Sequence, residues 1–213
     1  MKAKLIFSVM LVLFLKLNLA AQTGNYPKGA YMGIDEIRSK SPSEALDLNV
    51  IKRTPGDIKM AGGNDYKLAT DDKTIKGKTL RKELWAYSNG DILFINCLQY
   101  KLQPWYAAVI NSGRYLVFKG GIPMDNKMYK SEMAVTAVAF GAIGGAFTGA
   151  KLAMKRFLYA LDLETDTVKM IVPETLKALL ADRPELLEQY NQEKVLEDET
   201  VQIKYLTLLN QSN

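Results

Sequence analysis

The chain has 213 residues, with 28 Lys and Arg against 23 Asp and Glu, a single cysteine and no histidine. Without histidine, Ser-His-Asp and Cys-His nucleophilic catalysis are excluded, and the commonest zinc ligand is missing. One cysteine forms neither an internal disulfide nor a thiolate metal site, so we expect no metal and no cofactor, and stability must come from a hydrophobic core.

The first 21 residues have the pattern of a secretory signal peptide. Two lysines precede an apolar run over residues 5–15, and the small residues Ala20 and Ala21 lie just before the expected cleavage site at Gln22. Eleven residues are too few to span a bilayer core, which takes about 17–25. We therefore expect an exported protein, either periplasmic, outer-envelope or secreted. No cysteine follows the run, so a lipoprotein is not expected.

Removal of residues 1–21 changes the charge of the chain. The segment holds three of the 28 basic residues and no acidic residue, which leaves 25 bases, 23 acids and a net charge of +2. The excess of basic residues is therefore partly a property of the export signal. Lysines do not alternate with aromatic residues as they do on a stacking surface for single strands. We expect no nucleic-acid partner.

Residues 22–125 are expected to form a mainly antiparallel β domain. The strongest signal is Asn89-Gly90 between two strand-like runs, because both residues accept the positive φ of a type I′ turn. A second hairpin is indicated by two aromatic and β-branched runs around Asn111-Ser112-Gly113. The predicted strands are 84–88, 91–97, 105–110 and 114–119, with weaker strands at 47–53 and 66–70 and a short helix at 33–40.

Residues 126–155 contain an apolar segment of a less common kind. Residues 133–150 carry no charge, and Gly141, Gly145 and Gly149 are spaced four apart, so in a helix they share one face. This glycine-zipper pattern leaves three alternatives open. The segment is a buried connection, a membrane-contacting helix, or a self-association surface.

Residues 156–213 are expected to form a strand pair and an acidic tail of short helices. The strands are predicted at 156–163 and 167–172, and Pro173 suits the first turn of a helix. Asp182 and Asp198 are predicted N-caps for the next two helices. The fold class is therefore α+β: an antiparallel meander or small barrel, a Gly-rich apolar helix-like segment and a C-terminal tail of short helices, the tail packed on the β domain.

Charge is distributed unevenly along the chain. Residues 51–82 hold nine bases and four acids, whereas residues 162–199 hold eleven acids and four bases. One interpretation is that the acidic helices dock near the basic sheet surface, or that both surfaces are simply solvated. The other is that the basic surface binds an anionic ligand, such as an acidic glycan or a lipid head group.

Trp85, Trp105 and Tyr87 are the candidate ligand-facing residues. Aromatic side chains on one solvent-exposed sheet face would form a surface for sugar rings, although such residues are also common in a strand core. Cys97 lies within an apolar strand and is expected to be a buried side chain rather than a reactive thiol. No catalytic motif is present, so we predict no enzyme; paired carboxylates remain the one chemistry that a histidine-free hydrolase would use.

Three segments carry a resemblance to a known group of proteins. They are Lys59-Met60-Ala61-Gly62-Gly63-Asn64-Asp65-Tyr66-Lys67-Leu68, Leu84-Trp85-Ala86-Tyr87 and Leu102-Gln103-Pro104-Trp105-Tyr106. Together with the cleavage site, they resemble uncharacterised exported proteins of Bacteroidota over most of the mature chain. The resemblance implies an envelope or secreted location in a Gram-negative bacterium and supplies no active site. The favoured function is a non-enzymatic binding or structural module with an unknown ligand or envelope partner; the alternatives are a membrane-associating oligomer built on residues 133–150 and a carboxylate-based hydrolase.

Overall fold

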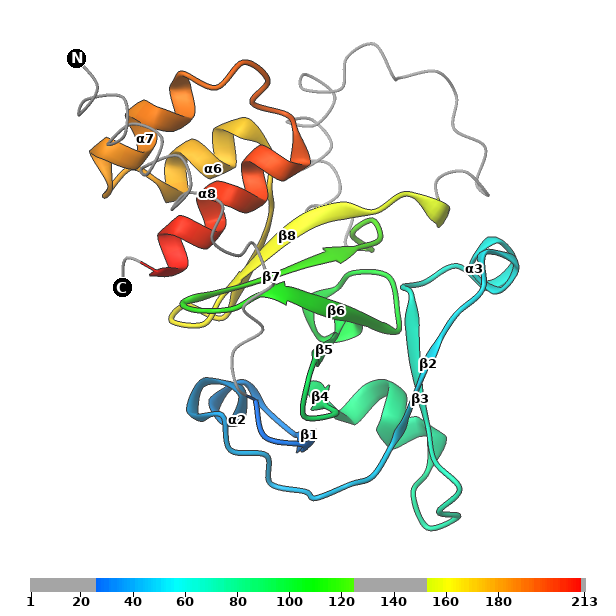
Figure 1. Cartoon of the computed structure of the whole chain (residues 1–213). Helices are drawn as coiled ribbons and strands as arrows, with labels where there is room; N and C mark the ends of the chain where they lie inside the picture. Colours follow the sequence, from blue (N-terminus) through cyan, green and yellow to red (C-terminus); the bar gives the residue numbers. More distant parts are fainter. Residues whose placement is uncertain (1–25, 125–152, 212–213) are drawn as a thin grey trace, which may run out of the picture.

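The computed structural model describes residues 26–124 and 153–211, which form one curved antiparallel sheet with helices packed at one end (Figure 1). The strands are β1 (Gly29–Tyr31), β2 (Asn49–Lys52), β3 (Tyr66–Ala69), β4 (Ala86–Ser88), β5 (Leu93–Asn96), β6 (Tyr106–Asn111), β7 (Tyr115–Gly120), β8 (Phe157–Asp162) and β9 (Thr167–Met170). The helices are α2 (Ile34–Ser39), α3 (Pro55–Ala61), α6 (Pro173–Leu179), α7 (Pro184–Asn191) and α8 (Glu199–Gln211), with a π-helical turn η1 (Thr79–Glu83) and a 3-10 turn η2 (Cys97–Tyr100).

The main sheet follows the order β1-β4-β5-β6-β7-β8-β9, and every neighbouring pair is antiparallel. No pairing joins β1 to β9 among the described residues, so the sheet is an open meander and not a closed barrel. The α+β class is confirmed. The strands on either side of residues 125–152 belong to the same sheet, because β8 pairs with β7 along its whole length.

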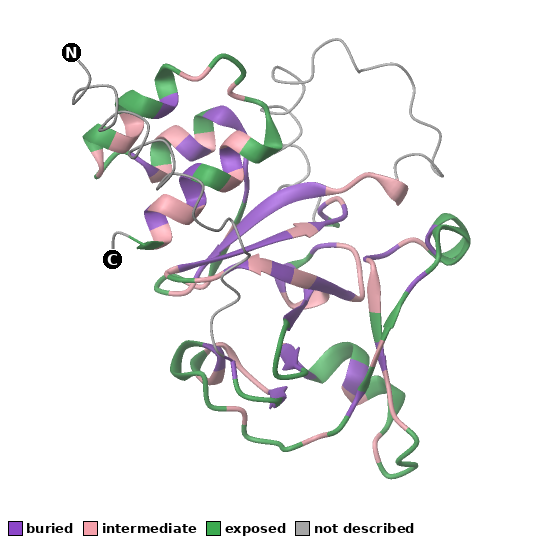
Figure 2. Ribbon diagram, viewed as in Figure 1, coloured by how far each residue is buried: buried purple, intermediate pink, exposed green. Residues whose placement is uncertain are grey.

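Side chains alternate between two faces of this sheet, as the period of a strand requires. The inner face is continuous from β4 to β9 and packs against α2 through Ile37. The outer face is divided: on β4–β6 it packs against β2, β3 and η1, and on β7 and β8 it packs against the C-terminal helices. Most of the central strands are therefore buried on both faces (Figure 2).

The sheet forks at β6. Its first residue, Tyr106, pairs with Tyr66 of β3, and its second half pairs with β7 instead. β3 in turn pairs with β2, and this two-stranded arm extends away from the helices with α3 at its end (Figure 1). Helix α3 begins with a capping box, in which Thr54 and Asp57 satisfy each other's backbone N–H groups.

The hairpin predicted around Asn89-Gly90 is confirmed, but its turn is shifted by one residue. Asn89 bonds to the Ile92 carbonyl through its N–H, so Gly90 and Asp91 occupy the central positions, and only Gly90 has a positive φ, of 100°. The Asn89 side chain accepts hydrogen bonds from the backbone N–H groups of Asp91 and Ile92 instead. Asparagine therefore closes this turn with its side chain and not by adopting the left-handed conformation.

Of the two N-caps predicted from the sequence, one is confirmed and the other is wrong. Asp198 accepts hydrogen bonds from the backbone of Thr200 and Val201 at the start of α8, as predicted. Asp182 does not cap α7: the N-cap is Arg183, which makes no side-chain capping bond. The prediction for Asp182 is therefore wrong, because Pro184 at the first helical position shifts the start of the helix by one residue.

Candidate functional site

The three glycines predicted to form a packing face, Gly141, Gly145 and Gly149, lie outside the described residues, as does the whole segment 133–150. Within ranges 26–124 and 153–211, none of the helices combines the length and the hydrophobicity that a membrane crossing requires. Residues 1–21, predicted to be a signal peptide, also lie outside the described part of the chain.

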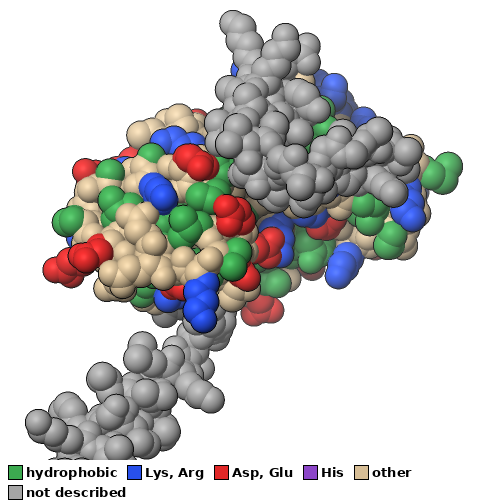
Figure 3. All heavy atoms as spheres, turned by 90° about the horizontal axis from the view of Figure 1, so that it is seen from above, with side chains coloured by type: hydrophobic (Ala, Val, Ile, Leu, Met, Phe, Trp, Pro, Cys, Tyr) green, Lys and Arg blue, Asp and Glu red, His purple; other side chains and the backbone are tan. Residues whose placement is uncertain are grey.

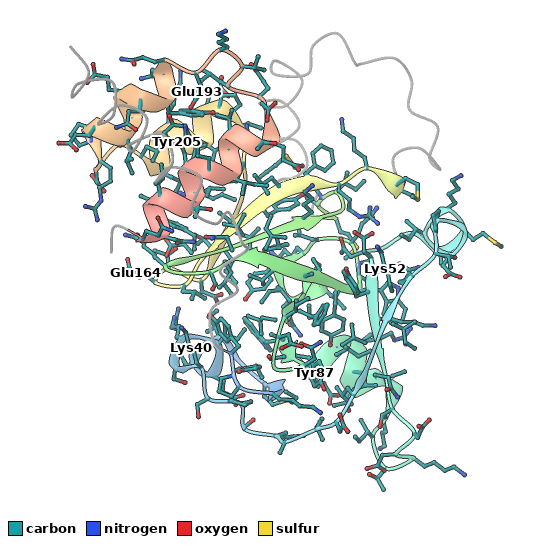
Figure 4. The ribbon with its side chains drawn as sticks, viewed as in Figure 1. Lys40, Lys52, Tyr87, Glu164, Glu193 and Tyr205 are labelled. Carbon is teal, nitrogen blue, oxygen red and sulfur yellow. The ribbon has the colours of Figure 1, made fainter. Side chains whose placement is uncertain are left out.

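Tyr87 is a core residue. Its side chain is 0 % exposed, and its hydroxyl donates to the Leu48 carbonyl and accepts from the Leu48 backbone N–H at 3.0 Å. Figure 4 shows it within the layers of the sheet region. Tyr87 therefore links the segment before β2 to the main sheet by hydrogen bonds. Its side chain is buried, so a ligand cannot contact it.

Trp85 and Trp105 do not form a shared aromatic surface. Trp85 is half-buried and packs edge-on against Tyr100, with ring centroids 5.8 Å apart, at the margin of the inner core. Trp105 lies instead beside two arginines, with Arg53 5.4 Å and Arg81 6.0 Å from its ring centre. No ring contact between the two tryptophans occurs in the described part of the chain.

The backbone at Trp105 is unusual. Its φ is 79°, a conformation that bulky residues rarely adopt. The neighbouring Gly63 has φ 89°, and a Cβ there would lie 2.5 Å from the Trp105 ring and 2.9 Å from the Arg53 guanidinium. The Arg53 guanidinium donates to the carbonyls of Gly62 and Asn64. These contacts pack the Trp105 indole tightly against the glycine turn.

Asn64 and Arg156 join the parts of the fork. Asn64 is 0 % exposed; its amide nitrogen donates to the Gln103 and Pro104 carbonyls, and its oxygen accepts from the Gly121 N–H. Arg156, next to β8, binds Asp65 through two nitrogens and the Gly63 carbonyl through one. Two of the three segments that carry the sequence resemblance, 59–68 and 102–106, are therefore in contact, and their shared role is structural.

A pocket of about 620 Å³ lies at the opposite end of the molecule, between strands β7–β9 and the C-terminal helices. Its floor includes a row of side chains set by the strand register, since Tyr115 is paired with Asp162 and Asp162 with Thr167. The wall includes Leu179 of α6 and Leu209 of α8. We call this cavity the Arg114 pocket; it is lined by Arg114, Tyr115, Asp162, Thr165, Thr167, Lys169, Ala178, Leu179, Asp182, Arg183 and Leu209.

Arg114 is held in place by two carboxylates. Its guanidinium lies 3.2 Å from the Asp162 carboxylate and 3.0 Å from that of Glu164, and it stacks 5.2 Å from the Tyr115 ring. Figure 4 shows Glu164 on the turn between β8 and β9, below α8. The hydrogen bond to Asp162 raises the pKa of Arg114. Nε of Arg114 is nevertheless buried and makes no hydrogen bond in the structure.

Asp162 is fixed in its charged form. Burial raises the pKa of its carboxyl, but hydrogen bonds from the Glu164 N–H and from Arg114 outweigh burial and lower the pKa overall. Asp162 therefore holds Arg114 in position, and its low pKa does not suit the role of a general acid.

Two charged side chains of the pocket remain available to a ligand. Neither the Lys169 nor the Asp182 side chain has a hydrogen bond or an ion pair among the described residues, and both residues are exposed to solvent at the cavity. Thr165 and Thr167 share one hydrogen bond between their hydroxyls, at 2.7 Å, which leaves one hydroxyl proton for another acceptor. The pocket therefore presents several donors, a carboxylate and an apolar wall.

Cys97 is fully buried, and burial raises the pKa of its thiol. Across residues 26–124 and 153–211, no three Cys, Asp or Glu side chains are grouped closely enough to hold a metal ion.

The sequence did not indicate this pocket. Arg114, Lys169 and Asp182 are far apart along the chain and belong to no common motif. Two of its residues nevertheless lay at recognisable positions in the sequence. Arg114 and Asp162 are at the ends of strands that were predicted correctly, next to predicted turns. What was missing was the pairing of β7 with β8, which places them side by side.

Comparison with known proteins identifies the family. A family model described as a family of unknown function (DUF6563) matches residues 29–213. The chain belongs to this family. The match begins at β1 and continues past the end of α8, so the sheet, its arm and the helical tail all fall within one family domain. No match was found among curated proteins or among solved structures.

Proposed function

We propose that this DUF6563 protein is an exported, non-enzymatic module of the Gram-negative cell envelope, periplasmic, outer-envelope or secreted, that binds a small carboxylate in the Arg114 pocket. Export is supported by the signal-peptide pattern of residues 1–21, and a Bacteroidota source is supported by the sequence resemblance. The binding role rests on the pocket, which is the more specific observation.

The observation that carries the proposal is the incomplete hydrogen bonding of Arg114. Its guanidinium is oriented by Asp162 and Glu164, yet the buried Nε has no acceptor. A buried donor without an acceptor costs about 1–3 kcal/mol, and a shift of the Arg114 side chain that lets a ligand oxygen reach Nε would recover this cost. Lys169 adds a positive charge to the same cavity. Together these groups suit the oxygens of a carboxylate.

The apolar wall of the pocket indicates which kind of group the ligand carries besides its carboxylate. Leu179 and Leu209 face the same cavity as the charged groups, and the volume of about 620 Å³ is typical of pockets for small organic molecules. Such a site suits a compact organic acid better than an inorganic anion, because the carbon skeleton would cover the leucines while the carboxylate meets the cations.

A thermal-shift screen tests the proposal. Protein purified after expression of the full chain is heated with acetate, succinate, glutamate or galacturonate, each against an equal ionic strength of NaCl. We expect at least one acid to raise the melting temperature, and Lys169→Met to reduce that shift. Lys194→Met is the matched control, because Lys194 is exposed but does not line the pocket. Equal shifts in wild type and both variants would contradict the proposal.

Cell fractionation tests the location separately. The full chain is expressed in a Gram-negative host, and periplasm, membranes and medium are probed before and after a high-salt wash. We expect an N-terminus at Gln22 and recovery outside the cytoplasm. Retention of residues 1–21 together with a cytoplasmic location would contradict export while leaving the pocket proposal intact.

A further inference from the structure

The structure separates the two oppositely charged parts of the chain. The basic arm, residues 51–82, comprises the end of β2, α3, β3, the following loop and most of η1, whereas the acidic tail, residues 162–199, runs from the end of β8 through α7 to the start of α8. Figure 1 places α3 and the arm on one side of the molecule and α7 on the other. No ion pair between the arm and the tail occurs among the described residues. The interpretation that the acidic helices dock near the basic sheet surface is therefore wrong.

Most of the charge on the arm is exposed and not neutralised locally. Arg53 is buried and bonded to carbonyls, and Lys78 pairs with Glu83 just outside the arm. The other bases are exposed and have no ion pair in the described part of the chain. They are Lys52, Lys59, Lys67, Lys73, Lys76, Arg81 and Lys82. Figure 4 shows Lys52 at the end of β2, next to α3.

The tail carries the complementary charge. Glu199 pairs with Lys119, and Glu193 pairs with Lys204 and accepts a hydrogen bond from Tyr205. The remaining acids around α7 are exposed and have no ion pair among the described residues. Asp182, Glu185 and Glu188 recur every three residues, and the last two share one side of the helix. Figure 3 shows acidic side chains among basic and apolar ones over the helical part of the surface.

These charges point to a second copy of the chain as the partner. An arm that carries a net positive charge and a tail that carries a net negative charge attract each other, and in one molecule the fold keeps them apart. The mature chain is also nearly neutral, with 25 bases and 23 acids, so repulsion between whole molecules is weak. We propose that the protein self-associates head to tail, with the basic arm of one copy against α7 and its acidic flanks on the next.

This contact joins two different surfaces, so each copy can contact one neighbour through its arm and another through its tail. Such heterologous contacts form rings or open chains and not simple two-fold dimers. Because exposed charges interact over a distance set by screening, the association must weaken with salt. Association through an apolar segment, as expected from the sequence of residues 133–150, would not weaken with salt in this way.

Sedimentation velocity of the purified full-chain product tests the proposal. Samples are compared at about 20 mM and about 300 mM NaCl, where the screening length falls from about 20 Å to about 6 Å. We expect a concentration-dependent increase in mass at low salt and an association constant at least ~tenfold lower at high salt. A monomer under both conditions overturns the proposal. Association that salt does not change also overturns it, and assigns self-association to an apolar surface.

Charge-reversal variants identify the surfaces. We expect Lys59→Glu with Lys67→Glu on the arm, or Glu185→Lys with Glu188→Lys on the tail, to abolish association. Mixing the two double variants pairs a reversed arm with a reversed tail and restores a complex. Lys28→Glu with Lys40→Glu is the control: it changes the net charge as the arm variant does, at exposed positions outside both regions. If only heparin beads, and no second copy, bind the arm in a charge-dependent way, the partner is an external polyanion and the proposal fails.

Discussion

The side-chain oxygen of Asn64 accepts a hydrogen bond of 2.7 Å from the backbone N–H of Gly121. This bond links the turn before β3 to the residue that follows β7, so one buried amide holds the two branches of the sheet together at the fork. The same side chain donates to the carbonyls of Gln103 and Pro104.

Replacement of Asn64 is therefore expected to destabilise the whole fold. Asn64→Ala leaves the buried Gly121 N–H and two carbonyls without their partner, and we expect a loss of about 2–4 kcal/mol in the free energy of unfolding. Urea denaturation followed by tryptophan fluorescence measures it. Asn49→Ala, at an exposed position of β2, should change stability by less than about 0.5 kcal/mol. Equal effects of the two substitutions would contradict the role given to Asn64.

Gly63 is expected to be intolerant of any side chain. Gly63→Ala combines a positive φ with a Cβ that lies 2.5 Å from the Trp105 ring, and we expect a loss of about 2–4 kcal/mol. Gly62→Ala also has a positive φ but meets open space, so about 1 kcal/mol is expected there. Gly77→Ala, with neither constraint, should be nearly neutral. Any other ranking of the three melting temperatures would argue against tight packing at Trp105.

The ion pair of Asp162 with Arg114 should give stability a defined pH dependence. The pKa of Asp162 is lowered in the folded protein, so its charged form stabilises the fold above the unfolded pKa, near ~4, and this contribution is lost as pH falls through the folded value. Asp162→Asn removes the charge and should cost about 1.5–3 kcal/mol at pH 7. The difference between variant and wild type should shrink as thermal unfolding is repeated at lower pH. A difference that is constant from pH 7 to below ~3 would contradict the assignment.

The thiol of Cys97 should be inert in the folded protein. It is fully buried in the inner core, and burial raises its pKa, so little thiolate is present or accessible at neutral pH. We expect Ellman's reagent to label no thiol in native protein and one thiol per chain in urea. Prompt labelling of the native protein would show that Cys97 is reached without unfolding.

The strands were largely predictable because local patterns determine them. Runs of aromatic and β-branched residues, with turns at Asn89-Gly90 and Asn111-Ser112-Gly113, predicted β4 to β7 to within a few residues. Helix α3 was missed, although Thr54, Pro55 and Asp57 form the pattern of a capping box followed by proline at the first helical position.

The candidate site was not predictable, because long-range pairing creates it. Arg114 and Asp162 meet only through the register of β7 with β8, and Lys169 joins them through β9. Tyr87 was predicted wrongly for a related reason. Its residue type suits a ligand surface, but alternation along β4 places it on the outer face of the sheet, which β2 and η1 cover.

The most direct test of the binding proposal is the nuclear magnetic resonance signal of the Arg114 Nε–H group. Uniformly ¹⁵N-labelled protein is titrated with succinate, glutamate and galacturonate, and the signal is assigned by its absence from Arg114→Lys. The proposal predicts that one of these acids shifts this signal saturably, since its carboxylate supplies the acceptor that Nε lacks, and that Lys169→Met weakens the titration roughly tenfold or more. An Arg114 signal that none of the three acids moves would contradict the proposal.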